Sequence, residues 1–155
     1  MTRLAPCLLA CLVVGCAETR PEPAVSPEAL RQRAAALRAA GKTEESARLY
    51  VQAIGTQRTD TRDGRAAAAD LRRELASLRI SADDLAGAEK LYREALTLLE
   101  TAPRGSDAAI INLRTQLAGL CYRRSRLDEA ADFYRSALSL EVALLGELTP
   151  TRWAR

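Results

Sequence analysis

Three ten-residue stretches of the chain are versions of one another: ESARLYVQAI (45–54), GAEKLYREAL (87–96) and EAADFYRSAL (129–138). They align without gaps and place Tyr50, Tyr92 and Tyr134 at a constant spacing of 42 residues (92 − 50 and 134 − 92). In each stretch a small residue precedes the tyrosine by four positions, and an alanine follows it by three. Residues three and four apart share one face of a helix, so each stretch predicts an amphipathic helix. A fixed period of this length predicts three copies of one structural unit.

A second apolar stripe recurs upstream of the tyrosine stretches. Leu71, Leu75, Ala76 and Leu78 are followed 42 residues later by Leu113, Leu117, Ala118 and Leu120. In the first unit Ala34 fits this stripe and Leu37 lies beside its last position, but Arg33 stands where the other units have leucine. Each unit is therefore predicted to be a pair of helices, giving six helices in all.

Turn and capping residues mark the predicted breaks between these helices. Ser26 and Pro27 suit a helix start, and Gly41 suits a tight turn within the first pair. The predicted breaks further along are the loop 55–64, the segment 103–106, the start of the last helix at Leu127 and its end at Gly146. We expect the units to cover about 26–60, 66–104 and 106–146.

The two stripes resemble the tetratricopeptide repeat, and the resemblance spans 26–150. The 42-residue period and the Leu145-Gly146-x-x-x-Pro150 junction are similar to the kinesin-light-chain-type variant. The resemblance implies an all-α fold of three antiparallel hairpins stacked as a short right-handed superhelix. It also implies that the residues packing neighbouring repeats together are Tyr50, Tyr92, Tyr134, Ala53, Ala95 and Ala137.

In this family the first helices line the concave side, and positions flanking the Leu-Ala pair face the ligand. Carried over, these positions are Glu28, Arg31, Ala35, Arg38, Asp70, Arg73, Ser77, Ile80, Asn112, Thr115, Gly119 and Tyr122. The cationic donors among them suit an extended or helical peptide that offers carboxylate or carbonyl groups. The alternative is that each arginine is only a solvated helix position. The resemblance thus implies an adaptor that binds another protein, whose identity the sequence does not give.

The last predicted helix offers a second candidate surface, because it is apolar over much of its circumference. Solenoids usually end in a polar capping helix, but only the tail 151–155 follows Pro150. We expect dimerisation or partner docking at this open end, through Phe133, Leu138, Leu144 and Trp153. This gives the alternative function of a self-associating structural subunit. A frayed, partly exposed end is the simpler interpretation.

The N-terminus is typical of a lipoprotein signal. Residues 1–15 combine Arg3 with an apolar run, 4–14, that is too short to span a bilayer. The run ends Val-Val-Gly-Cys16, which resembles the bacterial lipobox and implies lipidation of Cys16 after cleavage. Ala17 after that cysteine predicts the outer membrane, facing the periplasm, where the cell has one. The polar, proline-containing segment 16–25 is predicted to be a tether to the folded domain.

Composition argues against other classes of function. The chain has no histidine, no glycine-rich phosphate loop and no cysteine pair for a metal, so we predict no enzyme, no cofactor and no metal. A formal net charge of +3 is too weak to indicate nucleic-acid binding. Cys121 is interpreted as a small buried residue, and the turn 123–126, with three arginines, as a solvated basic knob.

Overall fold

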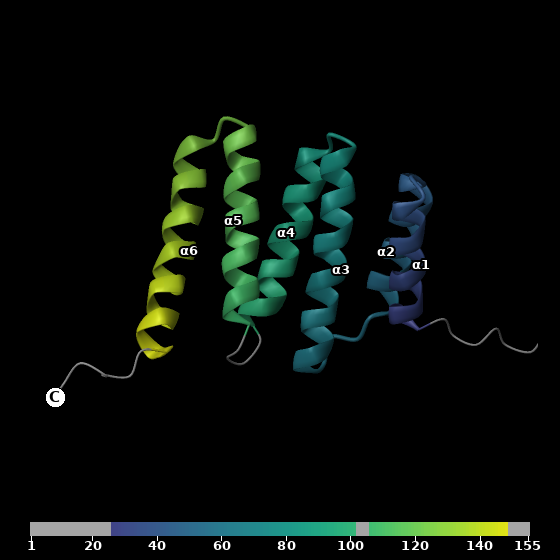
Figure 1. The fold of residues 1–155 in the computed structure, drawn as a ribbon, viewed down its shortest axis with the longest axis horizontal. Helices are drawn as coiled ribbons and strands as arrows, with labels where there is room; N and C mark the ends of the chain where they lie inside the picture. The colour runs from purple at the N-terminus through teal and green to yellow at the C-terminus, as the bar shows by residue number, and fades with distance from the viewer. Residues whose placement is uncertain (1–25, 102–105, 149–155) are drawn as a thin grey trace, which may run out of the picture.

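The first helix begins where its caps place it. The Ser26 hydroxyl accepts a hydrogen bond from the Ala29 amide at 3.2 Å, and Pro27 fills the first helical position, where no N–H is needed. The computed structural model describes residues 26–101 and 106–148, and this part of the chain is all-helical. Its helices are α1 (Pro27–Ala39), α2 (Thr43–Thr56), α3 (Arg62–Ser81), α4 (Leu85–Glu100), α5 (Asp107–Arg123) and α6 (Leu127–Leu148) (Figure 1).

The same turn closes each of the three hairpins. Gly41, Asp83 and Ser125 lie 42 residues apart and share a left-handed backbone, with φ of 76°, 60° and 59°. In the first turn the Gly41 amide donates to the Arg38 carbonyl at 3.0 Å and the Lys42 amide to the Leu37 carbonyl at 2.9 Å. This pairing is the Schellman motif, and it recurs after α3 and α5. The sequence period is therefore also a period of the backbone.

Two hydrophobic clusters form the core, and each joins a hairpin to the first helix of the next. One cluster holds Leu30 and Ala34 of α1, Tyr50 and Ala53 of α2, and Leu71, Leu75 and Leu78 of α3. The other contains residues of α3, Tyr92, Ala95, Leu96 and Leu99 of α4, and Ile110, Leu113, Leu117 and Leu120 of α5. The leucines of the upstream stripe and the tyrosines of the first two units thus lie inside these clusters.

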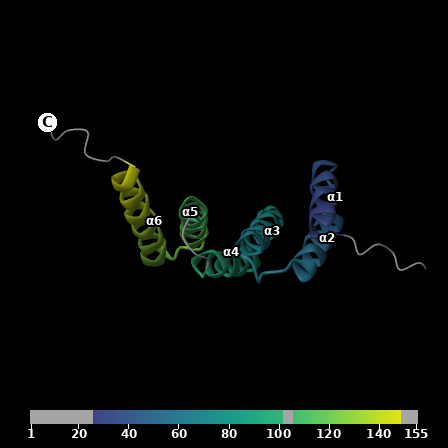
Figure 2. The same cartoon turned by 90° about the horizontal axis from the view of Figure 1, so that it is seen from below.

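The stacked hairpins form an arc. Helices pack as the pairs α1/α2, α3/α4 and α5/α6, and the pairs are joined by contacts of α2 with α3 and of α4 with α5. Figure 2 shows α1, α3 and α5 toward the inner side of the arc and α2 and α4 on its outer side. The fold class is therefore as predicted: three antiparallel hairpins stacked as a tetratricopeptide-like helical repeat.

Two predicted boundaries differ from the structure. The predicted loop 55–64 shortens to 57–61, because α2 continues to Thr56 and the Thr61 hydroxyl caps α3 by accepting from the Gly64 amide at 3.0 Å. Gly146 does not end the last helix, which continues to Leu148. None of the described helices has a stretch both long and apolar enough to cross a membrane.

Candidate functional site

The inner side of the arc carries a cavity of about 330 Å³ between α3 and α5. Its walls combine small and apolar side chains with a few polar ones: Ala66, Ala69, Asp70, Arg73, Leu99, Ser106, Ala109, Asn112 and Leu113. Three of the predicted ligand-facing residues, Asp70, Arg73 and Asn112, meet here. The cavity therefore offers an apolar floor with hydrogen-bond donors and acceptors at its rim.

A chain of ion pairs connects this cavity to α1. Arg38 Nη1 contacts Glu74 Oε2 at 2.8 Å, and Arg73 Nη2 lies 3.8 Å from the other oxygen of that carboxylate. The same Arg73 nitrogen contacts Asp70 Oδ1 at 3.2 Å. Glu74 is the best shielded of these four side chains, at 20% exposure. It fixes the orientation of two arginines that were predicted to contact a ligand.

The arginines predicted to face a ligand are paired with acidic side chains. Arg31 also contacts a carboxylate, since its Nη1 lies 3.4 Å from Glu28 Oε2 one helical turn away. All three predicted arginines are thus matched by acidic side chains, and the charge of the groove is locally balanced. Glu74 was not among the predicted residues, because it directly follows Arg73 and nothing in the repeat pattern shows that it reaches across to Arg38.

The other predicted groove residues are more dispersed. Ser77 lies beside Arg38, whose Nη1 donates to its hydroxyl at 3.4 Å. The Thr115 side chain is exposed, with its hydroxyl donating to the Ile111 carbonyl at 2.9 Å, and Tyr122 is 65% exposed near the end of α5. Ile80 instead packs against the core around α4. Only the part of the groove near the cavity combines apolar surface with convergent polar groups.

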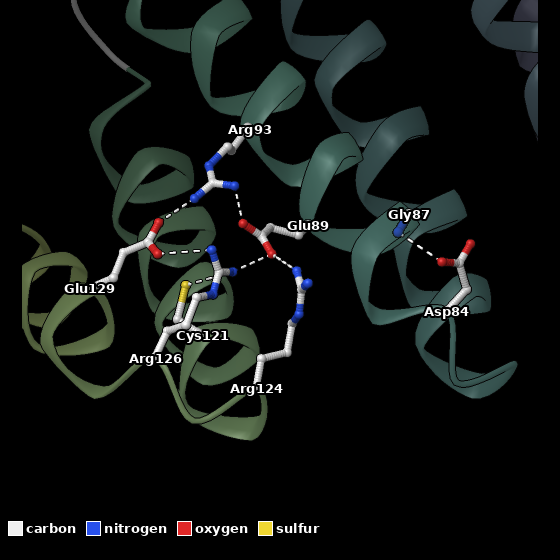
Figure 3. A network of polar contacts seen from close by, with 8 residues as sticks. All are labelled: Asp84, Gly87, Glu89, Arg93, Cys121, Arg124, Arg126 and Glu129. Carbon is white, nitrogen blue, oxygen red and sulfur yellow. Dashed lines mark hydrogen bonds and ion pairs between the residues drawn. The ribbon is translucent and has the colours of Figure 1, made fainter.

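A second polar cluster connects α4 by ion pairs to the turn between α5 and α6 (Figure 3). Glu89 is a buried acid, its side chain 4% exposed, and its carboxylate contacts the guanidinium groups of Arg93, Arg124 and Arg126. Arg93 and Arg126 also contact Glu129, the latter at 2.9 Å. The prediction that this turn is a solvated basic knob is therefore wrong for Arg124 and Arg126, because both contact the buried carboxylate of Glu89.

The arginines decide the charge state of Glu89. Burial disfavours the ionised carboxylate, but hydrogen bonds from Arg126 and Arg124 and the charge of Arg93 outweigh burial and lower the pKa of Glu89 below its ordinary value. The signal in the sequence is a break in the repeat: Ala47 and Ala131 occupy the equivalent positions in the other two units. A charged residue at a position that is elsewhere alanine requires local partners.

Possible ligand atoms for a metal also meet in this cluster. The nearest such atoms of Glu89, Cys121 and Glu129 lie within 4.8 Å of one another. A cation there would compete with guanidinium groups that already contact both carboxylates. Burial raises the pKa of the Cys121 thiol, which is the opposite of nucleophile activation. The cluster is accordingly arranged to hold helices together.

The predicted open-end residues separate into three groups. Leu138 is exposed on α6, whereas Phe133 is half-buried and packs against the core around α4 and α5. Leu144 is half-buried. Trp153 and the predicted lipidation residue Cys16 lie outside the described residues. Leu127 and Val142, which were not among the predicted site residues, are each 60% exposed.

Comparison with solved structures identifies the architecture. The structure of BtubC (BKLC) from P. vanneervenii matches 83% of this chain with a TM-score of 0.70 and 18% identity, and the structure of MamA matches 80% with a TM-score of 0.64 and 15% identity. The matches span 52% and 63% of those two chains, respectively. No family model and no curated protein matches the sequence. The fold is thus that of tetratricopeptide-like helical repeats.

Proposed function

We propose that this chain is a membrane-anchored adaptor that holds a segment of another protein in its concave groove. The observation that carries this proposal is the cavity between α3 and α5, where polar groups surround an apolar floor. Such a combination fixes a ligand by a few hydrogen bonds while burying one of its apolar side chains. The groove is proposed to act by binding.

The balanced charges refine what the groove would hold. Asp70 offers acceptors, while Arg73 and the Asn112 amide offer donors, so both groups of a peptide backbone find partners at the rim. A purely acidic segment would have to compete with Asp70 and Glu74 for the arginines. We therefore propose a client segment with an apolar side chain flanked by polar or mixed-charge residues.

Photocrosslinking tests the groove directly. A photoreactive amino acid at Asn112 should crosslink the client in intact cells, whereas the same amino acid at Lys90, exposed on the outer helix α4, should not. Ala109→Phe, which fills the cavity, should abolish the adduct, and Ala86→Phe, an equivalent change on α4, should leave it intact. Equal adducts from both positions, or an adduct that survives Ala109→Phe, would contradict the groove as the binding site.

The membrane anchor rests on the sequence 1–16 and is a separate part of the proposal. Cys16 after an apolar run is proposed to carry the lipid, with Ala17 directing the protein to the outer membrane, where it would help assemble or dock an envelope complex. Cys16→Ser should move the protein from the membrane fraction to the soluble fraction of the envelope. An unchanged distribution of the Cys16→Ser protein would remove the anchor from the proposal.

A further inference from the structure

In the described part of the chain, no helix covers the third hairpin as α3 and α5 cover the first two. The α1/α2 core is closed by leucines of α3, and the α3/α4 core by leucines of α5. Among the described residues no helix follows α6 on its outer face. The apolar positions that form a contact between repeats elsewhere in the chain are consequently left facing solvent at this end.

Equivalent residues show this difference directly. Tyr50 and Tyr92 are 1% and 3% exposed, whereas Tyr134 at the same repeat position is 47% exposed. Leu138 is 60% exposed, while its equivalent Leu96 is 9% exposed. The face of α6 formed by Tyr134, Leu138 and Val142 is here called the α6 face. Tyr134 and Leu138 repeat positions that pack between hairpins elsewhere in the chain, and the exposed Val142 extends the face by one helical turn.

The two internal interfaces define what fits such a face. In each, the covering helix contributes three leucines at i, i+4 and i+7: Leu71, Leu75 and Leu78 in α3, and Leu113, Leu117 and Leu120 in α5. This spacing places the leucines on one side of the helix. A ligand for the α6 face is thus an amphipathic helix with the same stripe.

The first described helix, α1, does not carry this stripe. The equivalent positions in α1 are Ala29, Arg33 and Ala36, and all three are exposed. Docking α1 of a second copy onto α6 would put two alanines and an arginine where the internal interfaces have three leucines, so much less apolar surface would be buried. The loss of the stripe in α1 therefore disfavours head-to-tail stacking of copies.

Charge adds a second requirement. At the interface between the second and third hairpins, Arg114 directly follows the first leucine of the stripe, and its Nη2 contacts Glu100 on α4 at 2.9 Å. Residue 142, at the repeat position of Glu100, is valine, but the adjacent residue Glu141 is exposed and has no ion-pair partner among the described side chains. A helix with arginine after its first leucine would supply the counter-charge.

We propose that the α6 face binds an amphipathic helix of a separate polypeptide, with leucines at i, i+4 and i+7 and an arginine after the first. This site is distinct from the concave groove, so it adds a second partner contact to the proposed adaptor. The proposals for the two sites can be tested independently, because α6 contributes no residue to the lining of the cavity.

The α5 sequence supplies a probe of the required chemistry. A fluorescein-labelled peptide of residues 106–124 would be used, with Cys121 replaced by alanine and a staple joining the exposed positions 112 and 116, because isolated helices of this length are marginal in water. Its binding to the full chain carrying Cys16→Ser is measured by fluorescence anisotropy. A matched peptide with Leu113→Ala, Leu117→Arg and Leu120→Ala reproduces the residues of α1.

The proposal expects the leucine peptide to bind and the matched peptide not to bind. Leu138→Glu in the protein should weaken binding at least about tenfold, as loss of a central interface residue does. Val51→Glu, at a valine 53% exposed on α2, should leave it unchanged. No binding of the leucine peptide, or binding that Leu138→Glu leaves unaltered, would overturn the proposal.

Sedimentation distinguishes a second copy from a separate partner. The proposal expects the Cys16→Ser chain to remain monomeric at concentrations where the leucine peptide is bound. A dimer that dissociates with Leu138→Glu would show that another copy of this chain occupies the α6 face, which would overturn the assignment to a separate polypeptide.

Discussion

Ser125 has the least favourable backbone of the three hairpin turns. Its φ is 59°, within a degree of the φ of Asp83, and Gly41 occupies the equivalent position in the first turn. Glycine adopts this region without steric strain, and aspartate tolerates it by local hydrogen bonding, whereas serine has neither advantage. The repeat thus imposes one backbone geometry on three different residues.

Ser125→Gly should therefore stabilise the protein. Relief of strain at positive φ, partly offset by the greater freedom of glycine in the unfolded chain, gives an expected gain of about 0.5–1 kcal/mol in the free energy of unfolding. Urea denaturation measures it. Gly41→Ser is the matched control and should destabilise by a similar amount; a loss of stability in Ser125→Gly would show that the turn is not strained there.

Glu89→Gln should lower stability in a pH-dependent way. The pKa of Glu89 is lower in the folded than in the unfolded chain, so its contribution is complete above the ordinary glutamate pKa of about 4.3 and is lost as pH falls through the lowered folded value. At pH 7 the variant should lose about 1–3 kcal/mol, because Arg124 loses its carboxylate partner and Arg93 and Arg126 lose one of the two carboxylates that they contact. The difference from wild type should shrink toward zero in acid.

Urea titrations at several pH values from 7 down to 3 provide that measurement. Glu44→Gln serves as control, since Glu44 is exposed on the surface of α2. A Glu89→Gln deficit that stays constant across the acid range would mean that packing, and not the charge of the carboxylate, explains the loss.

Residue contacts were the part of the structure least accessible from sequence. Glu74 and Glu89 each contact arginines of a different helix or turn, at separations of 35 to 37 residues, and no local spacing encodes these pairs. The tyrosines were predictable because their packing follows the repeat itself, except that Tyr134, with no repeat packed on it, is half exposed.

Helix starts and ends depend on contacts that single glycines make. A Cβ added at Gly64, in the first turn of α3, would lie 2.4 Å from the Arg58 carbonyl oxygen, a backbone atom that cannot move aside easily. Gly119, in the middle of α5, has nothing within 4 Å of the same position. The close approach explains why α3 can begin so soon after the loop 57–61.

Replacing these two glycines by alanine should change the stability of the protein in opposite directions. Gly64→Ala should destabilise by about 1–3 kcal/mol through the backbone clash. Gly119→Ala should stabilise by about 0.5–1 kcal/mol, because alanine is the better helix former in open space. Thermal unfolding followed by circular dichroism compares both with wild type; two changes of the same sign would mean that the loop adjusts freely.

At the level of helices, the sequence predicted which helices exist better than it predicted where each helix starts and ends. Periodicity located all six helices, and Ser26 and Leu127 marked two starts correctly. The start of α3 was placed too late, because 55–64 is polar throughout and composition does not reveal that Thr61 acts as a cap. Gly146 was taken as a stop although glycine within a helix is merely unfavourable.

The described part of the molecule is a row of hairpins, each packed mainly against its neighbours in the sequence. In such arrays stability is approximately a sum of the stability of each repeat and of the interfaces between repeats. Tyr92 lies in an interface between hairpins, and Tyr134 occupies the same repeat position at an uncovered end. The two tyrosines therefore allow one substitution to be compared inside and outside an interface.

Tyr92→Ala should cost about 3–5 kcal/mol, as removal of a buried aromatic does, and should broaden urea unfolding by uncoupling the hairpins. Tyr134→Ala should cost about 1 kcal/mol or less, because half of its ring already faces water. If a leucine-striped helix covers the α6 face, adding the α5-derived peptide should stabilise wild type but not Tyr134→Ala. Equal losses at both positions without peptide would show that the third hairpin is covered in solution, because only a covered tyrosine contributes as much as Tyr92.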